Sequence, residues 1–176
     1  MRRAISLAGL GIALASVAIG TGSVRPAPIK VVETYERKCS SCHGKEGAML
    51  DKDFEKKYAS PRELREVVES MPGAIGMRSD ELDAMLAYTR AISRREPFVV
   101  WTGQQGDALL GEVSPAMAKV EARAKREKLR VERPQANQWR IVLPKGVRPE
   151  EVEITAQRGG VRTTLRLKDS PYSHTK

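Results

Sequence analysis

Between residues 31 and 95, hydrophobic and polar positions follow the period of a helix. In the clearest stretch, apolar residues recur every three or four positions at Leu82, Met85, Leu86 and Ile92. The pattern predicts three helices in this region. They cover residues 31–39, 60–69 and 79–95.

Two of these helices carry start signals. Ser60-Pro61-Arg62-Glu63 combines an N-cap serine, proline at the first helical position and a glutamate that completes a capping box. The last helix is expected to start at Ser79, because Asp80 and Glu81 then fall in the first turn, where the helix dipole favours negative charge.

The pattern changes in the second half of the chain. Residues 114–128 are rich in Ala, Lys and Arg and predict a helix that begins near Pro115. Short runs with strand-like alternation follow it, and residues 134–137 and 158–160 look like turns between paired strands. The expected strands are 129–133, 138–143, 152–157 and 161–168.

These elements predict a mainly α fold in two units. A helical domain covers residues 25–97, and a small α+β module covers residues 114–176. The Gly-rich segment between them is expected to be a linker over residues 98–113.

The first 24 residues have the layout of a secretory signal peptide. Arg2 and Arg3 precede an uncharged run from Ala4 to Val24, with small residues near its end. The run is also long enough to serve as an uncleaved membrane anchor. Either reading predicts an exported, periplasmic protein, with membrane contact only through such an anchor.

Charge separates the two halves of the remaining chain. Residues 26–97 hold 13 basic and 13 acidic side chains, whereas residues 98–176 hold 15 basic and nine acidic ones. The basic module is expected to dock on an acidic surface of a redox protein partner or on anionic lipid headgroups, or simply to be solvated. Because aromatic residues make up only 5% of the chain, a stacking platform for nucleic acid is not expected.

Both cysteines of the chain lie in the sequence Cys39-Ser40-Ser41-Cys42-His43. CxxCH is the attachment signature of a c-type haem: two thiols one helical turn apart form thioethers with the vinyl groups, and the adjacent imidazole binds the iron. A thiol–disulfide pair, a structural disulfide or half of a zinc site would also place two cysteines together. No strand pattern precedes the motif, and the one other histidine, His174, lies at the chain end.

Residues 31–95 resemble a small class I bacterial cytochrome c domain. The resemblance is carried by Tyr35 before the CxxCH motif, the Ser60-capped helix, Met71-Pro72 and the closing helix. It implies a helical haem wrap in which the first and last helices cross, one covalent haem c, and iron held by His43 and Met71. The chain departs from the family at Ala48, which stands where the family usually has a proline whose carbonyl holds the histidine.

Met71 and Met77 both lie between two predicted helices, where a chain can cross the distal face of a haem. We favour Met71 as the sixth ligand because proline follows it, whereas Met77 is constrained by the start of the next helix. Met85 is expected in the core, and Met49 follows His43 too closely to reach the opposite face.

The sequence therefore predicts a periplasmic monohaem cytochrome that carries single electrons, free or as a subunit of a redox complex, and is not itself an enzyme. If neither methionine binds, the iron is five-coordinate and the protein is a haem-based sensor or gas binder. A thiol–disulfide oxidoreductase is the third hypothesis.

Overall fold

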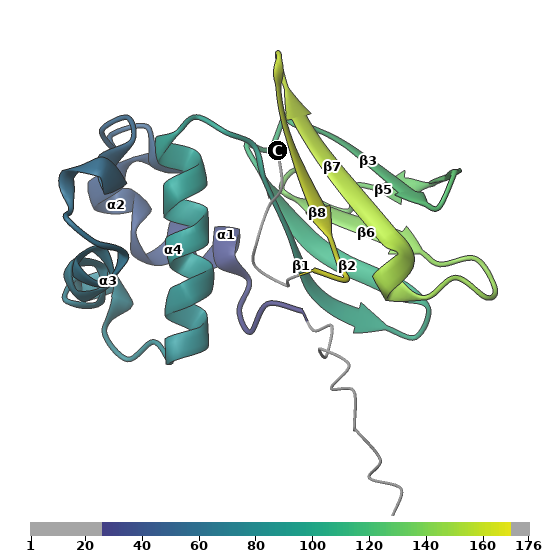
Figure 1. The fold of residues 1–176 in the computed structure, drawn as a ribbon, viewed down its shortest axis with the longest axis horizontal. Helices are drawn as coiled ribbons and strands as arrows, with labels where there is room; N and C mark the ends of the chain where they lie inside the picture. Colours follow the sequence, from purple (N-terminus) through teal and green to yellow (C-terminus); the bar gives the residue numbers. More distant parts are fainter. Residues whose placement is uncertain (1–25, 170–176) are drawn as a thin grey trace, which may run out of the picture.

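The computed structural model describes residues 26–169, and the expected signal peptide or anchor and His174 lie outside this range. Four α-helices lie beside two antiparallel sheets (Figure 1). We call residues 26–97 the helical part and residues 98–169 the sandwich. Over the described range, no helix has the length and hydrophobicity needed to span a bilayer.

The three helices predicted for residues 31–95 are confirmed as α1 (Val31–Lys38), α3 (Pro61–Glu69) and α4 (Ser79–Ser93). A short helix that the sequence did not predict, α2 (Ser40–His43), follows α1. Ser60 caps α3, since its hydroxyl accepts a hydrogen bond from the Glu63 N–H at 3.1 Å. The N-cap of α4 is Arg78 rather than Ser79, and the Glu81 carboxylate accepts the Arg78 N–H at 2.9 Å.

The prediction of a mainly α fold is wrong. The chain after Pro97 forms two four-stranded antiparallel sheets, which make the protein an α+β fold. One sheet has the order β1-β2-β6-β5 and the other the order β4-β3-β7-β8. The strands are β1 (Phe98–Gln105), β2 (Ala108–Ser114), β3 (Lys119–Ala124), β4 (Glu127–Leu129), β5 (Val131–Glu132), β6 (Gln138–Val142), β7 (Val152–Arg158) and β8 (Val161–Arg166).

Two segments account for this error. Residues 98–113, expected as a linker, lie in the paired strands β1 and β2. Residues 114–128, expected as a helix, contain β3 and most of β4. The alanines of this segment led to the helix prediction. In the structure Ala122 and Ala124 face the core while Arg123 between them faces solvent, and this alternation is the period of a strand.

The later strand predictions hold, with one refinement. β6, β7 and β8 form where expected, and β7 and β8 pair as a hairpin through the turn at residues 158–160. The expected strand at 129–133 is divided, because Leu129 belongs to one sheet and Val131 to the other. The chain crosses between the two sheets at Arg130.

The core of the sandwich lies between its sheets and is closed around Trp139. This side chain is 1% exposed and lies over Gly111, where a Cβ would come within 2.1 Å of the indole. Leu109 and Ile141 line the core from one sheet, and Ile154 and Leu165 from the other. The absence of a side chain at position 111 is therefore a condition of this packing.

Strand β1 belongs to two hydrophobic cores at once. Val99 and Trp101 face the sandwich core, while Phe98 and Val100 pack in the helical part with Tyr35 and other residues of α1 and α4. Because successive side chains of a strand point to opposite faces, one strand can serve both cores. The sandwich therefore completes the core of the helical part.

Candidate functional site

The CxxCH residues lie on a single helical turn where α1 meets α2. The Cys39 carbonyl accepts hydrogen bonds from the N–H groups of Cys42, at 3.2 Å, and of His43, at 3.0 Å. Tyr35 anchors α1 beneath this turn, because its ring packs edge-to-face on Tyr88 of α4 at 5.1 Å between centroids. The turn that carries the motif is thus set by the packing of the first helix on the last.

The two thiols are free but differ in environment. Cys39 is half-buried and packs against the core formed by α1 and α4, whereas Cys42 is exposed. Burial raises the pKa of the Cys39 thiol, and this outweighs the opposite influence of Lys38. In thiol–disulfide oxidoreductases the attacking thiol has a lowered pKa and is accessible, so Cys39 lacks the properties of such a nucleophile.

His43 ends α2 and is half-exposed, and the chain behind it turns back at Gly44. The His43 carbonyl accepts the Met49 N–H at 3.0 Å, and the Gly44 carbonyl accepts the Tyr35 hydroxyl at 3.3 Å. Ala48, where the resembled family has proline, has αR backbone angles at the end of a 3-10 turn. Backbone hydrogen bonds therefore hold this loop without the proline.

Residues 70–78, which we call the methionine loop, lie against the motif. A Cβ added at Gly73 would come 2.8 Å from the Lys38 carbonyl oxygen and 3.3 Å from the Cys39 sulfur. The loop thus approaches the end of α1 so closely that a residue without a side chain is needed there.

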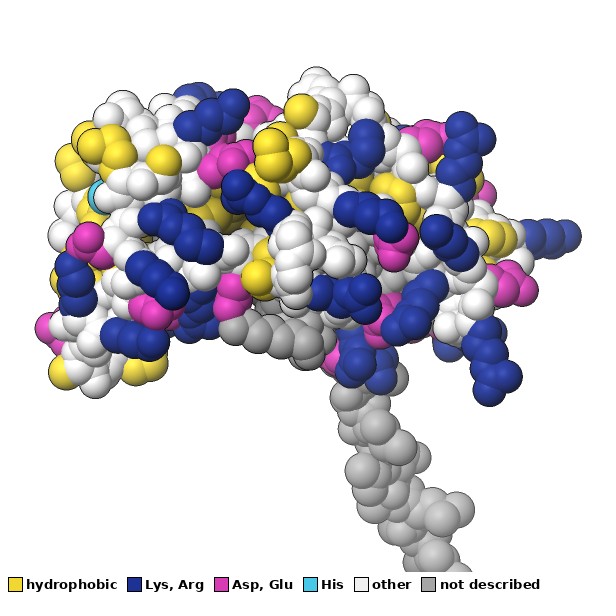
Figure 2. Space-filling model, turned by 90° about the horizontal axis from the view of Figure 1, so that it is seen from above, with side chains coloured by type: hydrophobic (Ala, Val, Ile, Leu, Met, Phe, Trp, Pro, Cys, Tyr) yellow, Lys and Arg dark blue, Asp and Glu magenta, His cyan; other side chains and the backbone are white. Residues whose placement is uncertain are grey.

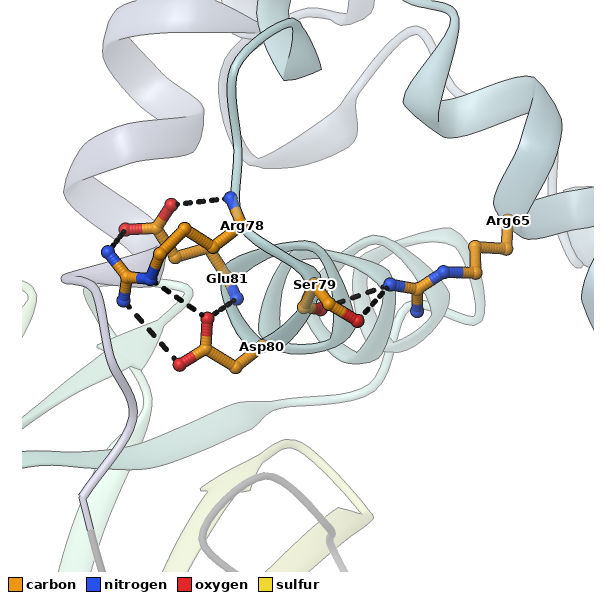
Figure 3. Close-up of polar contacts among 5 residues, drawn as sticks. All are labelled: Arg65, Arg78, Ser79, Asp80 and Glu81. Carbon is orange, nitrogen blue, oxygen red and sulfur yellow. Dashed lines mark hydrogen bonds and ion pairs between the residues drawn. The ribbon is translucent and has the colours of Figure 1, made fainter.

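Contacts between α3 and α4 hold the two ends of the methionine loop together. The Arg65 guanidinium of α3 donates to the Ser79 hydroxyl at 2.8 Å and to the Ser79 carbonyl at 3.1 Å (Figure 3). Arg65 also pairs with Asp83. At the start of α4, Arg78 pairs with Glu81 at 3.0 Å. These contacts hold the two ends of the loop close together, so the packing of α3 on α4 sets its position.

The four methionines of the helical part occupy different environments. Met71 is half-buried on the apolar cluster of α3 and α4, two residues before Gly73. Met77 is half-buried and packs against that cluster and against the core of α1 and α4. Met85 is 1% exposed in the core, as expected, and Met49 is 72% exposed.

The helical part exposes two large apolar side chains. Met49 and Ile75 are the large hydrophobic side chains exposed in the described helical part, and Ile75 is 69% exposed. Figure 2 shows hydrophobic surface at the helical end of the molecule, around the histidine. Met49 lies against Gly44, directly after the motif, and Ile75 is two residues from Gly73, which lies close to Cys39, so a hydrophobic ligand held by the motif could cover this apolar surface.

The sandwich holds both ends of the segment that carries the motif. Glu112 of β2, 1% exposed, accepts the N–H groups of Val32 at 2.9 Å and Glu33 at 3.1 Å, which caps α1. After the motif, the Glu46 carboxylate accepts the Ala116 N–H at 2.9 Å. Sequence reasoning missed both contacts, although a lone carboxylate within the apolar run of β2 was a visible signal for Glu112.

A cleft of about 250 Å³ lies between the helical part and the sandwich, with Lys45, Ile92 and Ser114 in its walls. It does not include the cysteines. Among residues 26–169, no three His, Cys, Asp or Glu side chains are grouped as a metal-binding cluster. The ligand set expected for a haem, one imidazole and one thioether sulfur, is of a different kind.

Compared with known proteins, the chain matches no family model, no curated protein and no solved structure. Assignment of a function therefore rests on the residues and their geometry.

Proposed function

We propose that this protein is a monohaem c-type cytochrome that carries single electrons. The observation that carries the proposal is the placement of two free thiols and an imidazole on one helical turn, against a closed loop that contains two methionines. This combination supplies both covalent attachment points and both kinds of axial ligand.

The residues present fit a haem. The two thiols are not joined in a disulfide, the Cys42 side chain is exposed, and Met49 and Ile75 of the helical part are exposed as well. Gly73 leaves the methionine loop close to the Cys39 sulfur. A bound haem would cover this apolar surface and add to the core of a helical part that is small by itself.

Each residue has a separate role in this proposal. Cys39 and Cys42 would hold the haem through two thioethers, in which each thiol adds across a vinyl group, sulfur to one carbon and hydrogen to the other. His43, through a ring nitrogen, and Met71, through its sulfur, would bind the iron. A haem held in this way supplies one-electron exchange at its iron, while the chain fixes its position and surroundings.

We assign the sixth ligand to Met71 rather than Met77. Met71 directly precedes the turn at Pro72–Ala74, in which Gly73 approaches Cys39. Both methionines are half-buried, but Met77 packs against two apolar clusters and Met71 against only one of them, so Met77 has the more core-like surroundings. In this assignment Met77 stabilises the loop and Met71 binds the iron.

The expected location and partners come from the amino-terminal sequence. The Arg2-Arg3 start and the apolar run to Val24 favour export to the periplasm, where c-type haem is attached, with the run either cleaved or retained as an anchor. The protein then exchanges electrons with other redox proteins, free or as a subunit of a complex, and is not itself an enzyme.

Production of the full chain in a host that matures c-type cytochromes tests the proposal. The purified protein should be red, should show the reduced spectrum of a low-spin c-type haem, and should exceed the mass of the Cys39→Ser/Cys42→Ser variant by about one haem. Ser41→Ala, in the same exposed turn, is the control and should keep the haem. A colourless wild-type protein with the mass of its amino acids alone would overturn the proposal.

The variants Met71→Leu and Met77→Leu test the ligand assignment, since leucine keeps the apolar volume. Met71→Leu should lower the reduction potential and let the reduced iron bind carbon monoxide, whereas Met77→Leu should do neither. If the wild-type protein binds carbon monoxide without displacing a ligand, the iron has an open site and a gas-binding sensor becomes the better description.

A further inference from the structure

The β4-β3-β7-β8 sheet of the sandwich has a charged face turned away from its core. Inward positions of this sheet are apolar, as at Ala122, Ile154 and Leu165. Outward positions and the β3–β4 turn carry basic side chains. We call this surface the outer face and define it by its six cations, Lys119, Arg123, Arg126, Lys128, Arg162 and Arg166.

Two carboxylates of the outer face are already neutralised within it. Glu121 pairs with Lys119 at 2.8 Å and with Lys128 at 3.6 Å. Glu153 pairs with Arg123 at 2.5 Å and Arg166 at 3.2 Å. Six cations against two carboxylates leave an excess of four positive charges on one side of one sheet.

The register of the strands arranges these charges in rows. Lys128, Arg123, Glu153 and Arg166 are successive partners across the four strands. A hollow of about 210 Å³ lies along the face, lined by Arg126, Lys128, Arg162 and Thr155 among others. Four of the six cations therefore line one shallow hollow, together with Glu121 and Glu153.

The outer face suits carboxylates better than lipid. Four of its six cations are arginines, whose planar guanidinium groups bind carboxylates in bidentate fashion. Its outward positions hold no large hydrophobic side chain to enter a bilayer, which membrane-surface segments usually provide. Figure 2 shows lysine and arginine side chains over the strand half of the molecule.

We propose that the outer face of the β4-β3-β7-β8 sheet is a docking surface for an acidic protein partner, which binds through clustered Asp and Glu side chains. The face lies on a different part of the chain from the CxxCH motif, so docking and electron exchange use separate surfaces. Binding of the acidic partner does not require the haem. That the partner then exchanges electrons with this protein rests on the proposed function.

A labelled decaglutamate peptide, titrated by fluorescence anisotropy at low ionic strength, tests the docking surface. Arg126→Glu/Arg162→Glu reverses two exposed cations that line the hollow. The control Lys52→Glu/Lys145→Glu reverses two exposed cations elsewhere and changes the net charge equally. The first variant should weaken binding about tenfold and the control less than about twofold, and binding should fall as salt rises.

Equal weakening by both double variants would show that only net charge matters and would overturn the proposal. Vesicles of phosphatidylglycerol and phosphatidylcholine form the second arm. If the Arg126→Glu/Arg162→Glu change abolishes vesicle binding and leaves peptide binding intact, the face is a lipid surface and the proposal is wrong. Haem content is measured on the same samples, so failure of docking is distinguished from failure of haem attachment.

Discussion

The helical part and the sandwich differ in how they reach stability. The sandwich encloses its own core of 16 buried residues between two sheets. The helical part divides its buried residues between two smaller clusters, and one of these takes Phe98 and Val100 from β1. One region is structurally self-sufficient, and the other depends on its neighbour.

The same contrast extends to the surface. The helical part is balanced in charge and exposes Met49, Ile75 and the Cys42 thiol. The sandwich is basic and has no comparable apolar exposure on its outer face. In the function proposed above, the sandwich therefore supports the helical part, while the haem-binding residues lie in the region that depends on its neighbour.

The largest expected effect comes from breaking the core of the sandwich. Trp139→Ala should destabilise the protein by about 3–5 kcal/mol, because a large buried side chain is replaced by a cavity. Since β1 serves both cores, α4 should lose protection from hydrogen exchange in the same transition as β7. If α4 keeps its protection while β7 loses it, the dependence of the helical part on the sandwich is refuted.

The cap that Glu112 places on α1 tests how far the helical part depends on the sandwich where the two meet. Glu112→Ala leaves the N–H groups of Val32 and Glu33 without their acceptor, and should cost about 1–3 kcal/mol. Urea denaturation measures this loss of stability. Hydrogen exchange should rise first in α1, which peptide-resolved mass spectrometry can measure. Glu121→Ala removes a half-exposed carboxylate held only in surface ion pairs and is the matched control, so its denaturation midpoint should move little.

The pH dependence of Glu112 gives a smaller effect of defined sign. Burial raises its pKa, outweighing the hydrogen bonds from Val32 and Glu33 that favour the charged form. In the unfolded chain Glu112 loses its proton near the ordinary pKa of 4.5, whereas in the native state it keeps the proton to a higher pH. Between these two pKa values the native state binds more protons, so the contribution of Glu112 to stability falls as pH rises through this window.

Glu112→Gln is neutral at every pH and removes this contribution. The stability difference between wild type and Glu112→Gln should therefore vary with pH across that window, because carboxylates that titrate elsewhere cancel between the two proteins. Urea denaturation at a series of pH values measures it. A constant difference would contradict the raised pKa.

Surface ion pairs should matter least in either region. Arg62 pairs with Glu66 at 2.8 Å on α3, but its side chain is 87% exposed. Arg62→Ala should leave the denaturation midpoint unchanged, since exposed pairs gain little in water and are screened by salt. A clear shift would show that α3 depends on its surface more than on its buried face.

Local sequence signals succeeded where one short segment decides the structure. The Ser60 cap and the period of the last helix fixed the positions of α3 and α4. They failed where the partners of a segment are distant in the chain. Residues 98–113 were predicted as a linker because no local pattern shows that β1 pairs with β2 and serves two cores. Residues 119–124 were predicted as helix because alanine favours helices locally, whereas pairing with β7 makes them a strand.

The sequence by itself determined the chemistry that the chain can offer: the order Cys39, Cys42, His43 sets the spacing of two thiols and an imidazole on any helical turn. Only the tertiary structure decided what surrounds that turn. Glu112 reaches α1 and Gly73 reaches Cys39 across gaps of 80 and 34 positions in the chain, which no local pattern encodes. The physical reason is that helical spacing depends on neighbouring residues, whereas burial and capping depend on which distant segments pack together.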